Sequence, residues 1–223
     1  MGSRRQCEKL ILAGKVSIGG KTVTNLATAV LPDAQGVTVD GKPAVLSHKI
    51  YLAFNKPAGL VCSRGSTHGE KNIYDLLPAE LKNLFYVGRL DRDTEGLLFL
   101  TNDGDWAQRV SHPRHEVKKV YAAEIAGRPE PRDFKRAVHG VQDEGETLRV
   151  ESIRLLGERP RRRGGRMIEV ILREGKKREI RRLFRALHHP VIYLKRLQIG
   201  DVKLGSLPAG KWRRLTEAEI KNF

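Results

Sequence analysis

The sequence predicts a mixed α+β fold that follows a small separate unit at the N-terminus. From Ile50 onward, short strand-like segments outnumber helical patterns, and the helical patterns come at irregular intervals. A doubly wound parallel sheet alternates strands and helices regularly, so the irregular order favours an α+β sheet. The chain has 223 residues, of which 39% are hydrophobic, which is enough for one large or two modest domains with a real core.

Residues 1–47 are predicted to form a helix followed by two hairpins. Cys7, Leu10 and Ile11 make an apolar helical stripe, and Gly14 ends it. The segments "VSIGGKTV" and "VTVDGKPAV" carry Gly-Gly and Asp-Gly turns between short strands. Five basic side chains are available to phosphates: Arg4, Arg5, Lys9, Lys15 and Lys21. Taken alone, this pattern fits a compact RNA-binding module and an ordinary solvated basic face equally well.

Residues 50–223 contain the predicted sheet. "IYLAFNKPAGLVCS" predicts two strands around a Pro-Gly turn, and "LFYVG", "GLLFLTNDG" and "KKVYAAEIAG" each predict one strand. "PRDFKRAVHG" predicts a short helix, and "RMIEVILREGKKREIRRLFRALHH" predicts a strand, a tight turn at Glu174–Gly175 and a second helix. Short strands and turns in "LQIGDVKLGSLPAGKWRRL" end the chain.

The charge of the chain indicates a polyanionic partner. Lys and Arg number 42 against 26 acidic residues, for a formal net charge of +16. Nucleic acid is the first candidate for such a partner. An anionic membrane is the alternative, but the sequence has no pattern typical of a membrane span or a signal peptide. We therefore expect a cytoplasmic, bacterial-type protein that binds no membrane.

Patterns typical of metal or nucleophilic chemistry are weak. Cys7 and Cys62 lie far apart and form no ligand or disulfide pattern. The histidines His112, His115, His188 and His189 have no convincing ligand spacing. The sequence also contains no phosphate-binding "GxxxxGK" loop and no serine nucleophile elbow.

The second predicted helix carries a basic face. At roughly 100° per residue its apolar side chains share one side; these are Ile180, Leu183, Phe184 and Leu187. Four arginines fall on the opposite side, namely Arg178, Arg181, Arg182 and Arg185. They have no regular acidic neighbours four residues away and so repel one another. This favours a phosphate-binding face over a merely solvated one.

An acidic turn separates two predicted strands. Asp91, Asp93 and Glu95 alternate there with Arg89 and Arg92. Side chains at the ends of buried strands are held rigidly, which suits a catalytic carboxylate. Spacing alone favours an ordinary polar turn and leaves the three carboxylates nearly equivalent.

Several motifs resemble those of the RsuA/RluB-type pseudouridine synthases, which isomerise uridine in ribosomal RNA. They are "NKPAGLVCS" (55–63), "GRLDRDTEGLLFLTNDG" (88–104), "KKVYAAEI" (118–125), "REGKKREIRRLF" (173–184) and "GSLPAGKWRRL" (205–215). Together they cover essentially all of residues 50–223 in the family's order. "SRRQCEKLILAGKVSIGGK" (3–21) is similar to the αL-type RNA-binding domain of a small-subunit ribosomal protein.

The resemblance implies a mixed, mainly antiparallel catalytic sheet and assigns roles to four residues. Asp91 is the catalytic carboxylate, acting by attack on C1′ of the ribose or through a glycal intermediate. Arg181 is the cation that keeps Asp91 ionised. Tyr121 stacks on the extruded uracil and is a candidate for taking the C5 proton, while Ile180 packs on the other side of the base. No cofactor and no metal is implied.

Further basic residues are expected to contact RNA, and the target is expected to be the large ribosomal subunit. Beyond those of the N-terminal unit, the expected contacts are Lys56, Arg89, Arg92, Lys118, Lys119, Arg178, Arg182 and Arg185. Glu179 stands where other branches of the family have Gln, as in the branch acting on the large subunit, and it adds a negative charge near the site. Small-subunit specificity is the alternative within the class. We expect a monomer that flips a uridine out of a structured element of ribosomal RNA or of an assembly intermediate.

The N-terminal unit differs from the usual αL-type domain. The αL-type domain normally opens with a further short helix before the "SRR" segment. The sequence begins with "MGSRR" and does not contain that helix, so we expect an incomplete core in residues 1–47.

A non-catalytic RNA-binding or ribosome-assembly protein would also have the charge, the front unit and the arginine helix. A DNA-binding regulator is less well supported, because no helix-turn-helix or dimerisation heptad is present.

Overall fold

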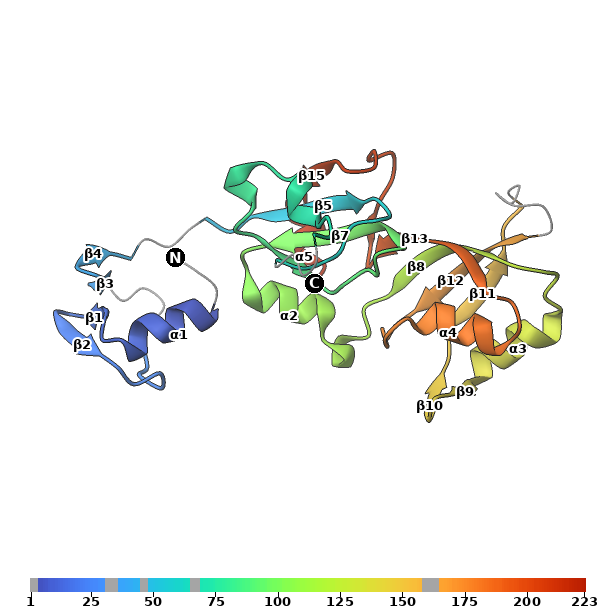
Figure 1. The fold of residues 1–223 in the computed structure, drawn as a ribbon, viewed down its shortest axis with the longest axis horizontal. Coiled ribbons are helices and arrows are strands. Elements are labelled where there is room, and N and C mark those ends of the chain that lie inside the picture. Colours follow the sequence, from blue (N-terminus) through green and yellow to red (C-terminus); the bar gives the residue numbers. More distant parts are fainter. Residues whose placement is uncertain (1–3, 31–35, 45–47, 65–68, 158–164) are drawn as a thin grey trace. The chain divides into compact units, whose positions relative to one another are not determined.

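The computed structural model describes residues 4–30, 36–44, 48–64, 69–157 and 165–223 (Figure 1). The chain divides into two compact units, Met1–His48 and Lys49–Phe223.

The first unit is a helix followed by a small antiparallel sheet. Helix α1 (Arg4–Leu12) precedes four strands paired in the order β2-β1-β3-β4. The strands are β1 (Val16–Ile18), β2 (Lys21–Val23), β3 (Val37–Val39) and β4 (Lys42–Pro43). The predicted helix and both predicted hairpins are therefore present. Among the described residues of this unit, none is buried, and Leu12 and Leu26 are largely exposed.

The second unit is built on a nine-stranded mixed sheet whose main path runs β11-β12-β8-β13-β7-β5-β15. Its strands are β5 (Tyr51–Lys56), β6 (Phe85–Val87), β7 (Glu95–Thr101), β8 (Lys119–Ile125), β11 (Ser152–Leu155), β12 (Arg166–Leu172), β13 (Val191–Ile199), β14 (Val202–Lys203) and β15 (Trp212–Arg214). Strands β13 and β7 pair in parallel, and the other neighbours pair antiparallel. The predicted mixed α+β, mainly antiparallel fold is confirmed.

Helices and one separate hairpin complete the unit. The α-helices are α2 (Gly104–Ser111), α3 (Pro131–His139), α4 (Glu179–Ala186) and α5 (Glu217–Lys221), and the 3-10 turns are η1 (Ile73–Leu76), η2 (Ala79–Leu81) and η3 (Pro113–His115). Strands β9 (Val141–Asp143) and β10 (Glu146–Leu148) form the hairpin. Across the described part of the chain, no helix has the length and apolarity needed to cross a bilayer.

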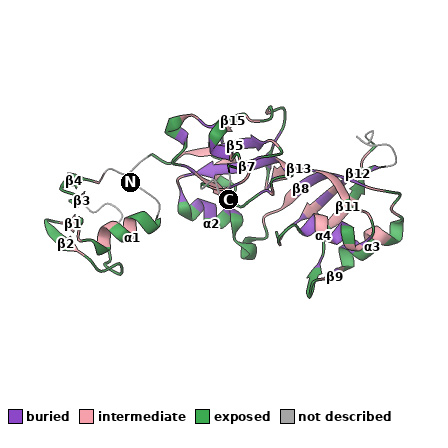
Figure 2. Ribbon diagram, viewed as in Figure 1, coloured by how far each residue is buried: buried purple, intermediate pink, exposed green. Residues whose placement is uncertain are grey.

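Side chains alternate between two hydrophobic cores on opposite faces of the sheet. Phe54 and Leu98 belong to the core that also contains the apolar side of α4, whereas Leu97 and Phe99 belong to the core that contains Trp106 of α2. Successive residues of a strand point to opposite faces, so β5 and β7 are buried on both. Figure 2 shows this burial along both strands.

Two predictions about local structure are wrong. The segment after the Pro-Gly turn forms no second strand, because only an isolated bridge joins Val61 to Asn72. The polar end of "GLLFLTNDG" begins a helix that the sequence reading missed, α2, because the carboxylate of Asp103 accepts hydrogen bonds from the backbone N–H groups of Asp105 and Trp106.

Gly96 allows the parallel pairing of β7 with β13. Its φ is +107°, and a Cβ added there would lie 2.2 Å from the carbonyl oxygen of Arg196, which is backbone. Gly96 and Arg196 are register partners in that pairing. A side chain at this position therefore forces the two strands apart and meets an unfavourable backbone angle as well.

We expect Gly96→Ala to lower the free energy of unfolding by about 3 kcal/mol or more, because both effects act at once. Gly205→Ala is the matched control, since Gly205 has φ +58° and nothing within 4 Å of the added Cβ. Its expected loss is about 1–2 kcal/mol. Denaturant unfolding of the two variants measures the difference, and equal losses would contradict the close approach.

Candidate active site

The acidic turn lies between β6 and β7 and is closed by its own backbone. The Thr94 N–H donates to the Asp91 carbonyl at 3.1 Å, and the Gly59 N–H donates to the Arg92 carbonyl at 2.7 Å. The second bond joins the turn to the loop after β5. Backbone hydrogen bonds alone therefore close the turn and attach it to the loop after β5.

Lys56 supports this turn from inside the protein. Its side chain is fully buried, and its ammonium group donates to the carbonyls of Pro57 (3.1 Å), Asp91 (3.1 Å), Arg92 (3.4 Å) and Thr94 (2.9 Å). Burial lowers its pKa, and nearby acidic groups oppose the shift. The prediction that Lys56 contacts RNA is wrong, because its donors are directed to the backbone of the chain itself.

Arginines of α4 and its N-cap bind the same turn from the outside. Arg181, whose side chain is 11% exposed, pairs with the Asp93 carboxylate at 3.2 Å and donates to the Asp93 carbonyl at 3.0 Å. Arg178 lies 3.8 Å from the Asp91 carboxylate and 3.4 Å from that of Asp93. Within 4 Å, the guanidinium that the described residues bring to the Asp91 carboxylate is that of Arg178, whereas Arg181 binds the neighbouring Asp93.

Arg181 nevertheless contributes to the electrostatics of the turn. Burial lowers its pKa, and the charges of Asp93 and Asp91 oppose that shift. The same guanidinium also donates to the Val191 carbonyl at 3.3 Å, so it joins α4, the turn and the start of β13. The side chain of Asp91 itself is 35% exposed and is open to solvent on one side.

Tyr121 and Ile180 lie in the hydrophobic core that includes the start of the turn. Both are buried, at 8% and 3% exposed, and both belong to the hydrophobic cluster that contains Leu90, the residue before Asp91. Tyr121 comes from β8 and Ile180 from α4, so the two elements and the start of the turn share this cluster. The apolar face predicted for α4 is confirmed, because Leu183, Phe184 and Leu187 are buried as well.

Arg196 is a residue that the sequence reading missed. It is 3% exposed on β13, its Nε donates to the Leu97 carbonyl at 2.7 Å, and its Nη1 lies 3.5 Å from the Tyr121 hydroxyl. Tyr121 and Arg196 are register partners across β8 and β13. The available signal is its spacing of two from Leu194, which is buried on the same strand.

Glu179 is buried at the start of α4. One carboxylate oxygen accepts from the Lys176 N–H at 2.9 Å, while the other has no hydrogen-bond partner among the described residues. Burial and the neighbouring Glu174 carboxylate raise the pKa of Glu179 to about 7. At neutral pH the charge expected from the sequence is therefore only partly present.

The far side of the arginine helix is neutralised by the β9–β10 hairpin. Arg182, with a side chain 11% exposed, lies 2.6 Å from both Asp143 and Glu146. Arg185 is more exposed but pairs with Asp143 at 3.3 Å and with Glu144 at 3.4 Å. Arg182 was expected to contact phosphates, and in the free protein its guanidinium is instead bound by acidic residues that lie far away in the sequence.

The other predicted RNA contacts differ in exposure. Lys118 and Lys119 are half-buried, and the Lys119 ammonium donates to the Val117 carbonyl. The exposed ones are Arg4, Arg5, Lys9, Lys15, Lys21, Arg89, Arg92 and Arg178. Besides the pairs of Arg178 with Asp91 and Asp93, ion pairs join Arg4 to Glu8, Lys15 to Asp40 and Arg92 to Glu70.

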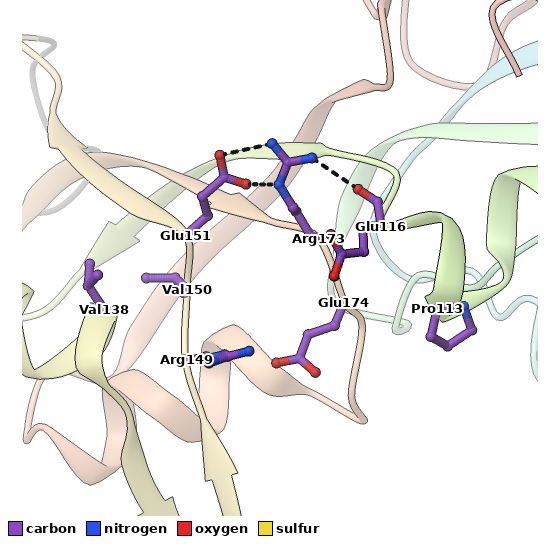
Figure 3. Close-up of a pocket in the computed structure, with 8 residues that line it drawn as sticks. All are labelled: Pro113, Glu116, Val138, Arg149, Val150, Glu151, Arg173 and Glu174. Atoms are coloured by element: carbon purple, nitrogen blue, oxygen red, sulfur yellow. Dashed lines mark hydrogen bonds and ion pairs between the residues drawn. The ribbon is translucent and has the colours of Figure 1, made fainter.

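A separate pocket of about 410 Å³ is lined by Pro113, Glu116, Val138, Arg149, Val150, Glu151, Arg173 and Glu174. Figure 3 shows Arg173 held by the Glu151 carboxylate and donating to the Glu116 carbonyl. None of the predicted site residues lines it. Among the described residues, no group of three or more His, Cys, Asp or Glu side chains is arranged to hold a metal ion.

Known proteins resemble the chain along its whole length. The RNA pseudouridylate synthase family model matches residues 50–186, and the S4 domain model matches residues 1–35. A protein of Aquifex aeolicus named as an uncharacterized RNA pseudouridine synthase is 39% identical over 221 residues, covering 99% of this chain and 88% of the relative.

Two further relatives extend the match to a named enzyme and to a solved structure. The ribosomal large subunit pseudouridine synthase B of Bacillus subtilis is 34% identical over 224 residues, covering 100% of this chain and 91% of the relative. A crystal structure of a pseudouridylate synthase matches with a TM-score of 0.71 at 30% identity, covering 99% of this chain and 93% of that one. The resemblance seen in the sequence motifs is confirmed.

We expect Lys56→Met to lower the free energy of unfolding by about 2–4 kcal/mol, because several buried carbonyls lose their donor. Lys203→Met, at an exposed position of β14, is the matched control. Denaturant unfolding measures both variants. A loss no larger than that of the control would show that the ammonium does not hold the turn.

We expect Glu179→Gln to stabilise the protein at alkaline pH. The folded state raises the pKa of Glu179 from 4.5 to about 7, because it favours the protonated carboxyl group. Protonation of Glu179 therefore contributes its full stabilisation below pH 4.5, and this contribution is lost as the pH rises through about 7. Gln keeps an acceptor for the Lys176 N–H and never ionises. The variant gains about 1–2 kcal/mol over wild type near pH 8 and nothing near pH 4, as thermal unfolding at the two pH values measures. Glu217→Gln, at a position whose side chain is 90% exposed, is the control. A gain for Glu179→Gln that does not change with pH would contradict the titration.

Proposed function

This chain belongs to the RNA pseudouridylate synthase family, and from that premise we propose that it converts one uridine of large-subunit ribosomal RNA to pseudouridine, with Asp91 as the catalytic carboxylate. Enzymes of this family isomerise uridine within RNA, so the chain is an enzyme. The family match covers the part of the chain that contains the acidic turn, Tyr121 and Arg181. The observation that carries the Asp91 assignment is the turn itself, because it is held from two sides by Lys56 and by Arg181.

Ribosomal RNA is favoured by both similarity and charge. The Bacillus subtilis relative, named for the large ribosomal subunit, matches this chain from end to end. A net charge of +16 suits a polyanionic substrate, and the S4 match supports RNA binding by the first unit. We propose that this unit binds RNA through its exposed basic residues, and that the enzyme acts as a monomer in the cytoplasm.

Asp91 is proposed to act on the ribose of the target uridine. The reaction breaks the bond between C1′ and N1, turns the uracil and joins C1′ to C5. Two paths use a carboxylate here: attack on C1′, or removal of a ribose proton to give a glycal. Both paths use the ionised form, and the guanidinium of Arg178 lies 3.8 Å from this carboxylate. One carboxylate suffices because the base stays bound and water is not a reactant, unlike in hydrolytic glycosidases.

Tyr121 and Ile180 are proposed to hold the extruded base. They share one cluster with Leu90, beside the catalytic carboxylate. A flipped uracil needs an aromatic face and an apolar partner, and pays a few kcal/mol for leaving its stack. Because both side chains are buried, the base must displace or part them on entry. The Tyr121 hydroxyl is then the group proposed to take the C5 proton.

The exposed basic residues beside the turn are proposed to bind the RNA backbone. Arg89, Arg92 and Arg178 are the ones in reach of a strand that delivers its uridine to Asp91. Phosphate contacts of this kind position the substrate without reading its sequence. Arg185 and Lys118 extend the basic surface, although Arg185 must release its acidic partners to bind a phosphate.

We expect Asp91→Asn to abolish isomerisation, with a rate loss of at least about 10³-fold, because the side chain keeps its shape and loses its charge. The assay is tritium release from ribosomal RNA transcripts carrying 5-tritiated uridine, with large-subunit and small-subunit transcripts tested separately. Asp105→Asn, at an exposed position of α2, is the matched control.

The possible outcomes separate the parts of the proposal. Retained activity in Asp91→Asn would reject the assignment of the carboxylate. Release from small-subunit transcripts alone would reject the large-subunit target. A wild-type protein that binds these transcripts and assembly intermediates without releasing tritium from any of them would reject the catalytic proposal in favour of a binding role.

A further inference from the structure

Arg196 carries a buried positive charge that the proposed mechanism does not yet use. Its guanidinium is 3% exposed, and its Nη2 has no hydrogen-bond partner in the described part of the chain. The other two nitrogens are engaged, Nε by the Leu97 carbonyl and Nη1, at 3.5 Å, by the Tyr121 hydroxyl. Among the described residues, no carboxylate forms an ion pair with it.

Such a residue is costly for stability alone. A buried charge without an opposite charge loses its hydration and gains little in return. Buried donors without acceptors are rare in proteins and call for an explanation where they occur. Arg196 is therefore better explained by what reaches its free Nη2 during function than by its contribution to the fold.

A second cation lies beside Arg196. Lys119 is two residues before Tyr121 on β8, so the two side chains share one face of the strand. Burial and, to a smaller extent, the charge of Arg196 lower the pKa of Lys119 to about 8, while Glu179 opposes the shift. The surroundings of the Tyr121 hydroxyl are thus positive and largely screened from water.

The reaction produces a transient anion where this charge lies. When the C1′–N1 bond breaks, its electron pair leaves with the uracil ring, and the negative charge spreads to the ring oxygens. C1′ meanwhile bonds to the carboxylate, or a ribose proton is lost to give the glycal. The ring must then turn while it carries this charge, so a fixed cation in a dry site stabilises it strongly.

We propose that Arg196, with Lys119 beside it, stabilises the uracil anion released from C1′ and holds it while it turns. This inference rests on the proposed function. Nη2 donates to a ring carbonyl oxygen of the base packed on Tyr121, and Nη1 keeps the tyrosine hydroxyl in place. When C1′ joins C5, the bond between C1′ and the carboxylate breaks, or the glycal regains its ribose proton, and the base loses its negative charge. The C5 proton then departs and N1 gains a proton, so uridine and pseudouridine have the same composition.

The experiment compares two leaving groups in one RNA. Transcripts carry either uridine or 5-fluorouridine at the target position, and the fluorine makes the base a better leaving group. Single-turnover rates are measured as loss of the starting nucleoside from digested RNA, and RNA affinity is measured in parallel. The variants are Arg196→Met, Arg196→Lys and Lys119→Met. Arg154→Met, on β11 with an exposed side chain, is the matched control.

We expect Arg196→Met to slow the uridine reaction by about 10- to 10²-fold with unchanged RNA affinity, the range of a charge-assisted hydrogen bond. The loss is several-fold smaller with 5-fluorouridine, because the better leaving group needs less stabilisation. Arg196→Lys recovers part of the rate, and Lys119→Met shows the same dependence on the base to a smaller degree.

Other results would overturn the inference. Equal losses for both bases would mean that Arg196 only holds Tyr121 in place, and a change confined to RNA affinity would make it a binding residue. If thermal unfolding shows that Arg196→Met does not fold, Arg196→Lys and Lys119→Met carry the comparison, and no dependence on the base in either rejects the proposal. A wild-type enzyme inactive on every transcript rejects the proposed function instead, so the two failures are distinguishable.

Discussion

The interaction on which the site depends is the hydrogen bonding of one buried ammonium group to the backbone of the acidic turn. Lys56 donates to the carbonyls of Asp91, Arg92 and Thr94, at the point where β5 ends and the turn precedes β7. A turn of this length has few other means of fixing its shape, because its side chains face solvent or the basic helix. The position of Asp91 is therefore set by a lysine that contacts no solvent. A charge buried in this way is tolerated because its donors are satisfied and acidic groups lie nearby.

The arginines of α4 divide into two groups with different consequences. Arg178 and Arg181 bind the acidic turn and so join α4 to the loop that precedes β7. Arg182 and Arg185 bind the acidic residues of the β9–β10 hairpin on the other side. Part of the positive charge of the chain is thus neutralised by ion pairs within the second unit. These pairs hold α4 against the acidic turn and against the β9–β10 hairpin. The basic residues proposed to bind RNA are the exposed ones of the first unit and around the turn.

Much of the fold could be predicted from the sequence because local patterns determined it. Apolar runs predicted β5 and β7, an alternating pattern predicted β8, and the helical spacing of Ile180, Leu183 and Phe184 predicted α4. The partners of the charged residues could not be predicted. The acids that bind Arg182 lie some forty positions earlier in the chain, so no inspection of neighbouring residues finds them. Lys56 was misjudged for a similar reason, since the end of a strand looks exposed until the turn that covers it is known.

Two buried basic residues of the central strands differ in whether all of their hydrogen-bond donors have acceptors. This difference distinguishes a structural role from a proposed functional one. Lys56 and Arg196 lie on strands that both pair with β7, and each donates to backbone carbonyls. Every donor direction of Lys56 meets an acceptor within the protein, so its charge is explained by the turn that it holds. Arg196 keeps one nitrogen without a partner in the described structure and has a second cation beside it. A protein that only needed to fold would gain by replacing such a residue with an apolar one, because buried unpaired charge destabilises. Arg196 lies next to Tyr121, the side chain proposed to stack on the base. Because Arg196 lowers the stability of the fold, its presence there supports a role in the reaction.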